Sequence, residues 1–194
     1  MTPEREAKLQ KVTDARQAGF IVVLEDIHDP HNAEAILRTC DAFGVHDVWF
    51  IFDKEKKFNP KRVGKSSSSS ANKWLSFRTF GKGSEAATEL HREDYTIVAT
   101  ALGSGAEDPY AIDLALQKVA LAVGNEHRGL SEGLLKAADM VLMIPMRGMV
   151  ESLNVSVATA LLIAEITRQR IAKGLHLSRS DEEKARILSY FSDR

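Results

Sequence analysis

The sequence predicts an α/β protein with a largely parallel sheet and helices on both of its faces. Short apolar, β-branched runs such as 20–24 and 119–124 are typical of strands buried on both faces, as in parallel sheets. Such runs alternate with helical patterns at least five times along the 194 residues. We therefore expect one domain, flanked by short helical extensions at both ends.

The patterns place the elements as follows. Strands are predicted over 20–24, 46–52, 95–102, 119–124 and 140–145. Helices are predicted over 3–17, 33–43, 84–90, 110–116, 131–139, 153–166 and 180–191. Asn32 is a suitable N-cap for the helix at 33, and Ser131 for the helix that it opens. Gly44 and Gly174 follow predicted helices and are suited to ending them.

The helix over 153–166 is apolar almost all round its circumference. A helix of this composition is expected to be buried on more than one side. Ser152 and Asn154 stand where it begins, and both residue types cap helices well. The preceding loop, 146–151, contains methionine, charged residues and glycine between two apolar elements. Loops of this kind, held by a rigid frame, often carry functional residues.

The composition excludes several classes of protein. Hydrophobic residues make up 44% and charged residues 27% of the chain, as in soluble globular proteins. The single cysteine, Cys40, excludes an internal disulfide framework and favours a reducing compartment. No apolar run reaches the roughly 20 residues of a membrane span, and the charged segment 1–17 has no secretory core. We therefore expect a cytoplasmic protein. We also expect no metal site, because no pair of the six histidines has the spacing of metal ligands.

Charge is distributed unevenly along the chain. The net charge is -1, but residues 53–83, here called the basic segment, hold nine cations and two acids and so carry +7. Local excess of this kind favours an anionic partner. The predicted RNA-binding residues are Lys54, Lys56, Lys57, Lys61, Arg62, Lys65, Lys73 and Trp74.

Aromatic residues are interleaved with these cations, at Phe58, Trp74, Phe77 and Phe80. Rings beside cations suit the stacking of unpaired RNA bases. The alternative is that the rings pack into the core below a solvated loop. The serine tract 66–70 is expected to become ordered when a ligand binds.

Two polar positions, residues 125–128 and Arg38, are candidates for a functional role. Residues 125–128 follow a predicted strand and precede a helix, where open α/β sheets bind ligands, although a plain turn is the alternative. Neither a phosphate-binding loop nor a dinucleotide fingerprint is present. Arg38 lies one helical turn after Glu34, so an ion pair on a solvated face explains it without a function.

Three stretches together resemble a known family. They are Asn32-Ala33-Glu34-Ala35-Ile36-Leu37-Arg38-Thr39-Cys40, residues 121–131 with Gly124-Asn125-Glu126, and residues 144–158 with Glu151-Ser152-Leu153-Asn154. In this order and separation they are similar to the three motifs of the SpoU-type RNA 2'-O-ribose methyltransferases of the SPOUT superfamily. The resemblance spans about 20–170.

The resemblance implies a deep C-terminal trefoil knot, a homodimer, and S-adenosylmethionine as the cofactor. The family's functional positions match Asn32, Arg38, Glu126, Ser152 and Asn154. The cofactor-binding positions match Thr100, Ala101, Leu102, Gly124, Asn125, Glu126, Ile144, Met146, Ser152 and Leu153. The serine tract departs from the more varied, glycine-containing loop that is expected there.

The flanking helices and the insertion ending at Trp74 resemble the branch of the family that methylates guanosine 18 in the D-loop of tRNA. This implies a methyltransferase domain over 20–172, with helical extensions at 1–19 and 173–194. The alternatives are methylation of another tRNA position or of rRNA, and a non-catalytic RNA-binding module. In this family the residue at Arg38 is proposed to take the hydroxyl proton. Since arginine stays protonated, we expect Arg38 to hold a phosphate and stabilise the alkoxide instead.

Overall fold

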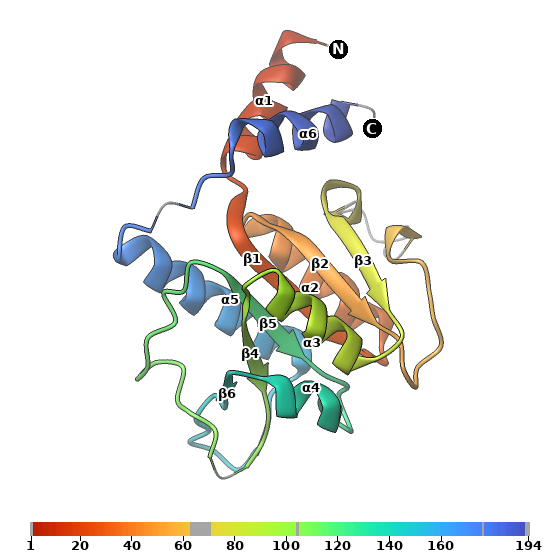
Figure 1. Cartoon of the computed structure of the whole chain (residues 1–194), viewed down its shortest axis with the longest axis vertical. Helices are drawn as coiled ribbons and strands as arrows, with labels where there is room; N and C mark the ends of the chain where they lie inside the picture. The colour runs from red at the N-terminus through yellow and green to blue at the C-terminus, as the bar shows by residue number, and fades with distance from the viewer. Residues whose placement is uncertain (1, 63–70, 104, 176, 193–194) are drawn as a thin grey trace.

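The computed structural model describes residues 2–62, 71–103, 105–175 and 177–192. Its strands form one six-stranded sheet in the order β3-β2-β1-β5-β4-β6, and every pairing is parallel (Figure 1). The strands are β1 (Gln17–Glu25), β2 (Val45–Ile51), β3 (Ser76–Phe80), β4 (Thr96–Thr100), β5 (Val119–Val123) and β6 (Met140–Leu142). The predicted α/β class with a parallel sheet is confirmed.

Helices cover both faces of this sheet, as predicted (Figure 1). The α-helices are α1 (Pro3–Asp14), α2 (Pro30–Ala42), α3 (Gly83–Arg92), α4 (Glu132–Ala137), α5 (Val155–Ala172) and α6 (Asp181–Ser192). Two short 3-10 helices, η1 (Pro60–Arg62) and η2 (Ala71–Trp74), lie between β2 and β3. None of the helices in the described ranges is both long enough and apolar enough to cross a bilayer.

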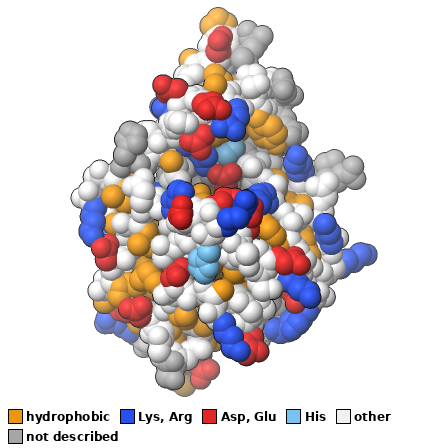
Figure 2. All heavy atoms as spheres, in the orientation of Figure 1, with side chains coloured by type: hydrophobic (Ala, Val, Ile, Leu, Met, Phe, Trp, Pro, Cys, Tyr) orange, Lys and Arg blue, Asp and Glu red, His pale blue; other side chains and the backbone are white. Residues whose placement is uncertain are grey.

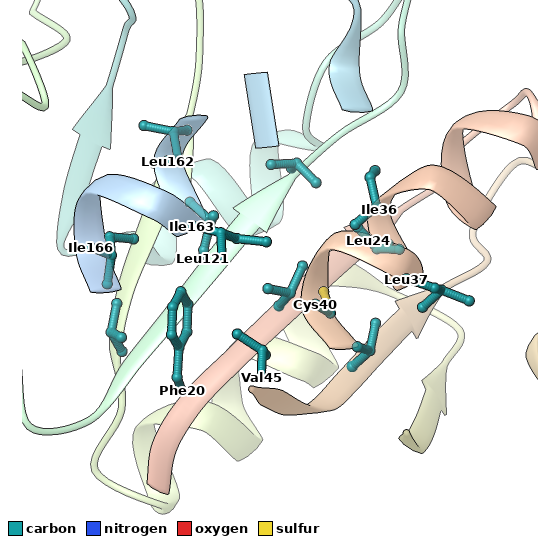
Figure 3. Close-up of a cluster of buried hydrophobic side chains, with 14 of the residues drawn as sticks. Phe20, Leu24, Ile36, Leu37, Cys40, Val45, Leu121, Leu162, Ile163 and Ile166 are labelled. Atoms are coloured by element: carbon teal, nitrogen blue, oxygen red, sulfur yellow. The ribbon is translucent and has the colours of Figure 1, made fainter. Parts of the chain in front are cut away.

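The core has two layers because successive side chains of each strand point to opposite faces. On β1, Phe20 and Leu24 face the layer formed with α2 and α5, where Cys40 and Ile163 also lie (Figure 3). Ile21 faces the other layer, which α3 and α4 cover. The β-branched runs of the sequence are thus buried on both sides, which is why they lack a polar alternation.

Helix α5 is buried on more than one side, as predicted, but not all round its circumference. Leu162, Ile163 and Ile166 are buried against the sheet. Val157 and Ile171 are 47% and 63% exposed. Helix α5 also packs against α2 and against the segment before β5, so it is buried on more than one side, but an apolar face remains in solvent.

The terminal helices α1 and α6 lie side by side, beyond the end of the sheet at which β1 begins (Figure 1). Leu9, Ile187 and Phe191 form a small core between them. Buried Arg16 links this unit to α2 through Asp41, with 2.5 Å between Nη2 and Oδ1. The predicted helices at both ends are confirmed, although α1 ends at Asp14 because Gln17 already belongs to β1.

The helix predicted over 110–116 does not form, and this prediction is wrong. Asp108 and Asp113 instead accept hydrogen bonds from the backbone N–H groups of Tyr110 and Ala115, which stabilises turns. The N–H of Leu114 donates to Gln169 of α5 at 2.7 Å. These side-chain acceptors replace the helical pattern of backbone bonds.

Strand β3 was not predicted, because its sequence, SFRTF, lies within the basic segment. It pairs with β2 at the edge of the sheet. Arg78 of β3 lies over the ring of Trp49, 4.3 Å from its centroid, and pairs with Glu89 and Glu93. One cation of the basic segment is therefore used to hold β3 against β2 and α3.

Candidate functional site at the carboxyl edge of the sheet

The loops that follow β1, β5 and β6 meet at the carboxyl edge of the sheet, and one hydrogen-bond chain joins them. Asn154 Nδ2 donates to Asn32 Oδ1 at 2.9 Å, and Asn32 Nδ2 donates to Glu126 Oε1 at 2.8 Å. These partners are 122 and 94 residues apart in sequence. The structure thus brings together three of the five predicted catalytic residues, here called the edge network.

Glu126 holds the network to the loop after β1. Its carboxylate also accepts from the backbone N–H groups of His28, at 2.9 Å, and Asp29, at 3.2 Å. Burial by itself raises the pKa of Glu126, but the hydrogen bonds from Asn32, His28 and Asp29 outweigh burial and lower it. Glu126 is therefore ionised, both of its carboxylate oxygens accept hydrogen bonds from the protein, and it is a poor proton acceptor.

Asn32 reaches this network because it does not cap α2, which corrects the sequence prediction. The N-cap is Asp29, whose Oδ1 accepts from the N–H of His31 at 2.9 Å. Pro30 occupies the first helical position, which its fixed φ and missing N–H favour. Asn32 thus lies within the first turn, and its side chain is available for Glu126 and Asn154.

Asn154 caps α5, as predicted. Its Oδ1 accepts from the N–H of Ser156 at 2.8 Å and from the hydroxyl of Ser156 at 2.6 Å. Its amide therefore stabilises the helix with one end and orients Asn32 with the other. Ser152 lies two residues earlier and is exposed, and its hydroxyl bonds to none of the described residues.

Arg38 lies on α2, six residues beyond Asn32, and its side chain is exposed. The ion pair with Glu34 that its spacing allows is not formed. Within the described ranges, the Arg38 guanidinium makes no hydrogen bond or ion pair at all. Its five N–H donors are therefore available to a ligand that binds next to α2.

Asn125 and Gly124 shape the turn after β5. Asn125 Nδ2 donates to the carbonyl of Asp26 at 2.8 Å, while its Oδ1 accepts from the N–H groups of His127 and Arg128. A Cβ on Gly124 would lie 2.3 Å from the carbonyl carbon of Gly129. Only glycine fits this close approach, so the turn brings Glu126 to the edge network.

The predicted cofactor-binding residues lie on β4 and on the loops after β4, β5 and β6, which open at the same edge. Thr100 ends β4, and its hydroxyl donates to the carbonyl of Ala122 at 3.2 Å. Leu102 is 68% exposed, and Ile144 packs partly against the core. No described backbone N–H from 144 to 153 donates to a protein acceptor. Exposed apolar surface beside such backbone donors suits a ligand that has both a ring and hydroxyl groups.

The basic segment places exposed lysines beside this edge. Lys54, Lys56 and Lys57, which follow β2, are exposed there. Lys61 and Lys73 are also exposed, but they lie in η1 and η2, towards the amino edge, where the carbonyl of Trp74 accepts from Arg16. Figure 2 shows Lys and Arg side chains along the right of the molecule, where the segment after β2 runs in Figure 1. Lys65, the serine tract and the side chain of Arg62 lie outside the described residues. RNA binding by this segment stays a prediction.

The rings of the basic segment pack as the alternative describes. Phe58 and Phe77 pack against the layer that contains Phe50. Phe80 lies 5.0 Å from the ring of Trp49. Trp74 meets Phe191 of α6 edge-on, with 5.3 Å between ring centroids. Most of these rings therefore contribute to packing within the chain.

Sequence reasoning missed Asp26 and Glu55, which bind the loops around the edge network. A signal for Asp26 was present, because an acid directly after a buried strand stands at the ligand-binding edge. No comparable signal marks Glu55, since its partner Arg128 is 73 residues away. In the described ranges, no three His, Cys, Asp or Glu side chains gather closely enough to hold a metal ion.

A cavity lies at the other end of the sheet, between the start of β1 and the end of α5. Phe43, Thr167, Ile171 and Leu175 are among the residues that line it. It is remote from the edge network, because β1 begins there and the edge network follows the end of β1.

Comparison with known proteins gives matches along nearly the whole chain. A model of the SpoU rRNA Methylase family matches residues 19–164. The tRNA (guanosine(18)-2'-O)-methyltransferase of Escherichia coli K12 is 35% identical over 192 residues, which cover 97% of this chain and 82% of that protein.

Solved structures are similar as well. The A. aeolicus TrmH/SpoU tRNA modifying enzyme has a TM-score of 0.85 and 33% identity, covering 98% of this chain and 96% of its own. The SpoU methyltransferase AviRb from Streptomyces viridochromogenes, in complex with the cofactor AdoMet, has a TM-score of 0.68 and 26% identity. That match covers 84% of this chain and 62% of the AviRb chain.

Proposed function

This chain belongs to the SpoU methylase family, and from that membership we propose the reaction it catalyses. It is an S-adenosylmethionine-dependent tRNA 2'-O-ribose methyltransferase. Its target is the ribose 2'-hydroxyl of guanosine 18, in the D-loop, as the names of its relatives indicate.

The observation that carries this proposal is the edge network. Asn32, Glu126 and Asn154 come from the three separate stretches that resemble the family motifs, and direct hydrogen bonds join them. Such bonds hold three loops in one arrangement, which is what a positioned transfer between two bound molecules requires. A plain RNA-binding module needs the basic segment but not this junction.

S-adenosylmethionine supplies an electrophilic methyl group to the ribose oxygen. The residues that would hold it are Thr100, Ala101, Leu102, Gly124, Asn125, Glu126, Ile144, Met146, Ser152 and Leu153. They fit this cofactor because the exposed side chain of Leu102 offers apolar surface and the backbone of 144–153 offers polar groups.

Arg38 acts on the RNA. Its guanidinium is exposed and has no partner in the described chain, so it can bind a phosphate at two points. It also stabilises the negative charge that develops on the 2'-oxygen as the hydroxyl proton passes to solvent water. Arginine keeps its own proton at neutral pH, so Arg38 is an electrostatic group here and not the base.

Glu126, Asn32 and Asn154 orient the loops and do not take the proton. The lowered pKa of Glu126 and its three donors make this carboxylate a weak base. Asn32 receives its orientation from both neighbours, and Ser152 presents a free hydroxyl to the bound molecules.

The enzyme is proposed to act as a homodimer. The apolar face of α5, with Val157, Leu161 and Ile171, is exposed in one chain, as is part of Phe43. A second copy packed on α5 would bury this face and satisfy the apolar pattern of the helix all round. Sedimentation would test this, because Leu161→Glu should give monomers while Lys136→Glu, a charge reversal at an exposed position of α4 on the other face of the sheet, serves as the control.

A trefoil knot is proposed for the C-terminal part of the fold. Gln169 of α5 donates to the carbonyls of Pro109 and Ile112 and accepts from the N–H of Leu114. The segment between β4 and β5 thus lies against α5, which supports passage of the later chain through that segment.

We also propose a methyltransferase domain over 20–172 with helical extensions at 1–19 and 173–194. The location proposed for the protein is the cytoplasm, where its tRNA substrate is.

The experiment that tests this function is transfer of labelled methyl from S-adenosylmethionine to unmodified tRNA transcripts, with nuclease mapping of the product. A 2'-O-methylguanosine at position 18 is the expected result. Methylation at another tRNA position or of rRNA would retain the chemistry and overturn the target. RNA binding without any transfer would establish the binding-module alternative.

A further inference from the structure

The start of the basic segment is bound to the end of β1 by one carboxylate. Asp26 Oδ1 accepts from the backbone N–H groups of Asp53 at 2.9 Å, Lys54 at 3.2 Å and Glu55 at 3.1 Å. Its Oδ2 accepts from Lys54 again, at 3.0 Å. Three consecutive N–H groups that converge on one acid fix the conformation of this backbone closely.

Asp26 is itself held on every side. Its side chain is buried, its φ is +51°, and its carbonyl accepts from Asn125 Nδ2 at 2.8 Å. Aspartate and asparagine tolerate this left-handed conformation better than other non-glycine residues. Because Asn125 precedes Glu126, Asp26 contacts both the basic segment and the turn that supplies the edge network.

A second carboxylate closes the arrangement from the opposite direction. Glu55, within the basic segment, accepts from Arg128 Nη2 at 2.6 Å and lies 3.2 Å from His28 Nδ1. Hydrogen bonds from Arg128 and then His28 lower the pKa of Glu55. Arg128 ends the turn after β5, and His28 donates its N–H to Glu126. Glu55 thus ties the basic segment to the same two loops.

We propose that Asp26 and Glu55 are positioning residues that hold Lys54, Lys56 and Lys57 in a fixed place relative to the edge network. Phosphate contacts made by these lysines then place the target ribose at the methyl-transfer edge. This inference rests on the proposed function. Without the two carboxylates the lysines would keep their charge but would no longer be held in one arrangement, so tRNA would bind less tightly in the productive register.

The first test compares Asp26→Ala with Asp26→Asn in steady-state methylation of tRNA. Alanine removes all acceptors and should raise KM for tRNA about tenfold, while the Kd for S-adenosylmethionine changes less than twofold. Asparagine keeps the Oδ1 acceptor and tolerates the positive φ, so it should recover most of the wild-type KM. Asp139→Asn is the matched control, because that carboxylate accepts from the N–H of Ile97, where β4 begins.

A double-mutant comparison shows whether Asp26 acts through the lysines. In a background with Lys54, Lys56 and Lys57 changed to Gln, Asp26→Ala should have little further effect on KM. Glu55→Gln tests the proposal even if Asp26→Ala does not fold, because Glu55 is only partly buried. This variant should raise KM for tRNA about two- to fivefold. Additive effects, or an unchanged tRNA KM in Asp26→Ala and Glu55→Gln, would overturn the proposal. Absence of methyl transfer by the wild-type protein would instead overturn the proposed function.

Discussion

Two helices of this chain, α5 and α2, use arginine in opposite ways. At the amino edge, Arg170 of α5 is fully buried and donates to Gln17 Oε1 and to the carbonyls of Ala18, Leu116 and Gln117. On the surface of α2, six residues beyond Asn32, Arg38 is exposed and has no hydrogen-bond or ion-pair partner within the described chain.

This contrast separates structural from functional cations. Burial lowers the pKa of Arg170 to about 10, so it remains charged at neutral pH, and every bond it makes joins elements of the fold. Arg38 makes no hydrogen bond or ion pair that the structure describes, which leaves its donors for a ligand. The surroundings of Arg170 therefore stabilise the fold, whereas the exposed surface of α2 at Arg38 is available for binding.

The largest effect is expected from Arg170→Met. The substitution removes the five-donor cation that binds three carbonyls and one amide oxygen at a buried position, so the free energy of unfolding should fall by about 3–5 kcal/mol. Urea denaturation measures this, and turnover per folded molecule should stay near that of the wild type. A loss below about 1 kcal/mol would mean that the amino edge does not depend on this cation.

Arg38→Ala should have the complementary effect. Loss of an electrostatic group at the reacting oxygen should reduce kcat about 10²–10³-fold, while the free energy of unfolding changes by less than about 0.5 kcal/mol. Arg38→Lys, which keeps the charge and loses the planar fork, should show an intermediate kcat. Full turnover by the lysine variant would rule out two-point contact with a phosphate.

The amino edge should also weaken in acid through His46. Burial lowers the pKa of His46 to about 4, and Arg179 and Arg16 nearby add to the shift against the opposing effect of Asp47. The unfolded chain therefore binds this proton first, and stability should fall as the pH drops from about 6.5 towards 4, by at most about 3 kcal/mol. Denaturation of the wild type and of His46→Gln across this range measures the effect. Equal pH dependence in both proteins would contradict it.

The smallest expected change in stability comes from Asn154→Ser. Serine retains the N-cap of α5 but has no Nδ2 to donate to Asn32, so the free energy of unfolding should change by a few tenths of a kcal/mol. Turnover should fall about tenfold if Asn32 requires that bond, which corresponds to about 1.4 kcal/mol. Wild-type turnover in this variant would mean that the hydrogen bond from Asn154 to Asn32 is not needed for methyl transfer.

The sequence by itself determined the fold class and most of the elements. Apolar runs without alternation required strands buried on both faces, and Asn154 and Ser131 marked helix starts through local hydrogen bonds. These features depend on residues close together in the chain, so their pattern is legible without the fold. The three family-like stretches also contained the members of the edge network before their contacts were known.

Only the tertiary structure decided which side chains meet. Asn32 could cap α2 by its position, yet Pro30 moves the cap to Asp29 and leaves Asn32 for Glu126, 94 residues away. Arg78 and Phe77 could serve RNA, yet β3 pairs with β2 and packs Phe77 into the core. Such choices depend on β5 lying beside β1, which brings the turn after β5 next to the loop after β1. Contacts across large sequence separations are set by strand order and packing, and no local pattern encodes them.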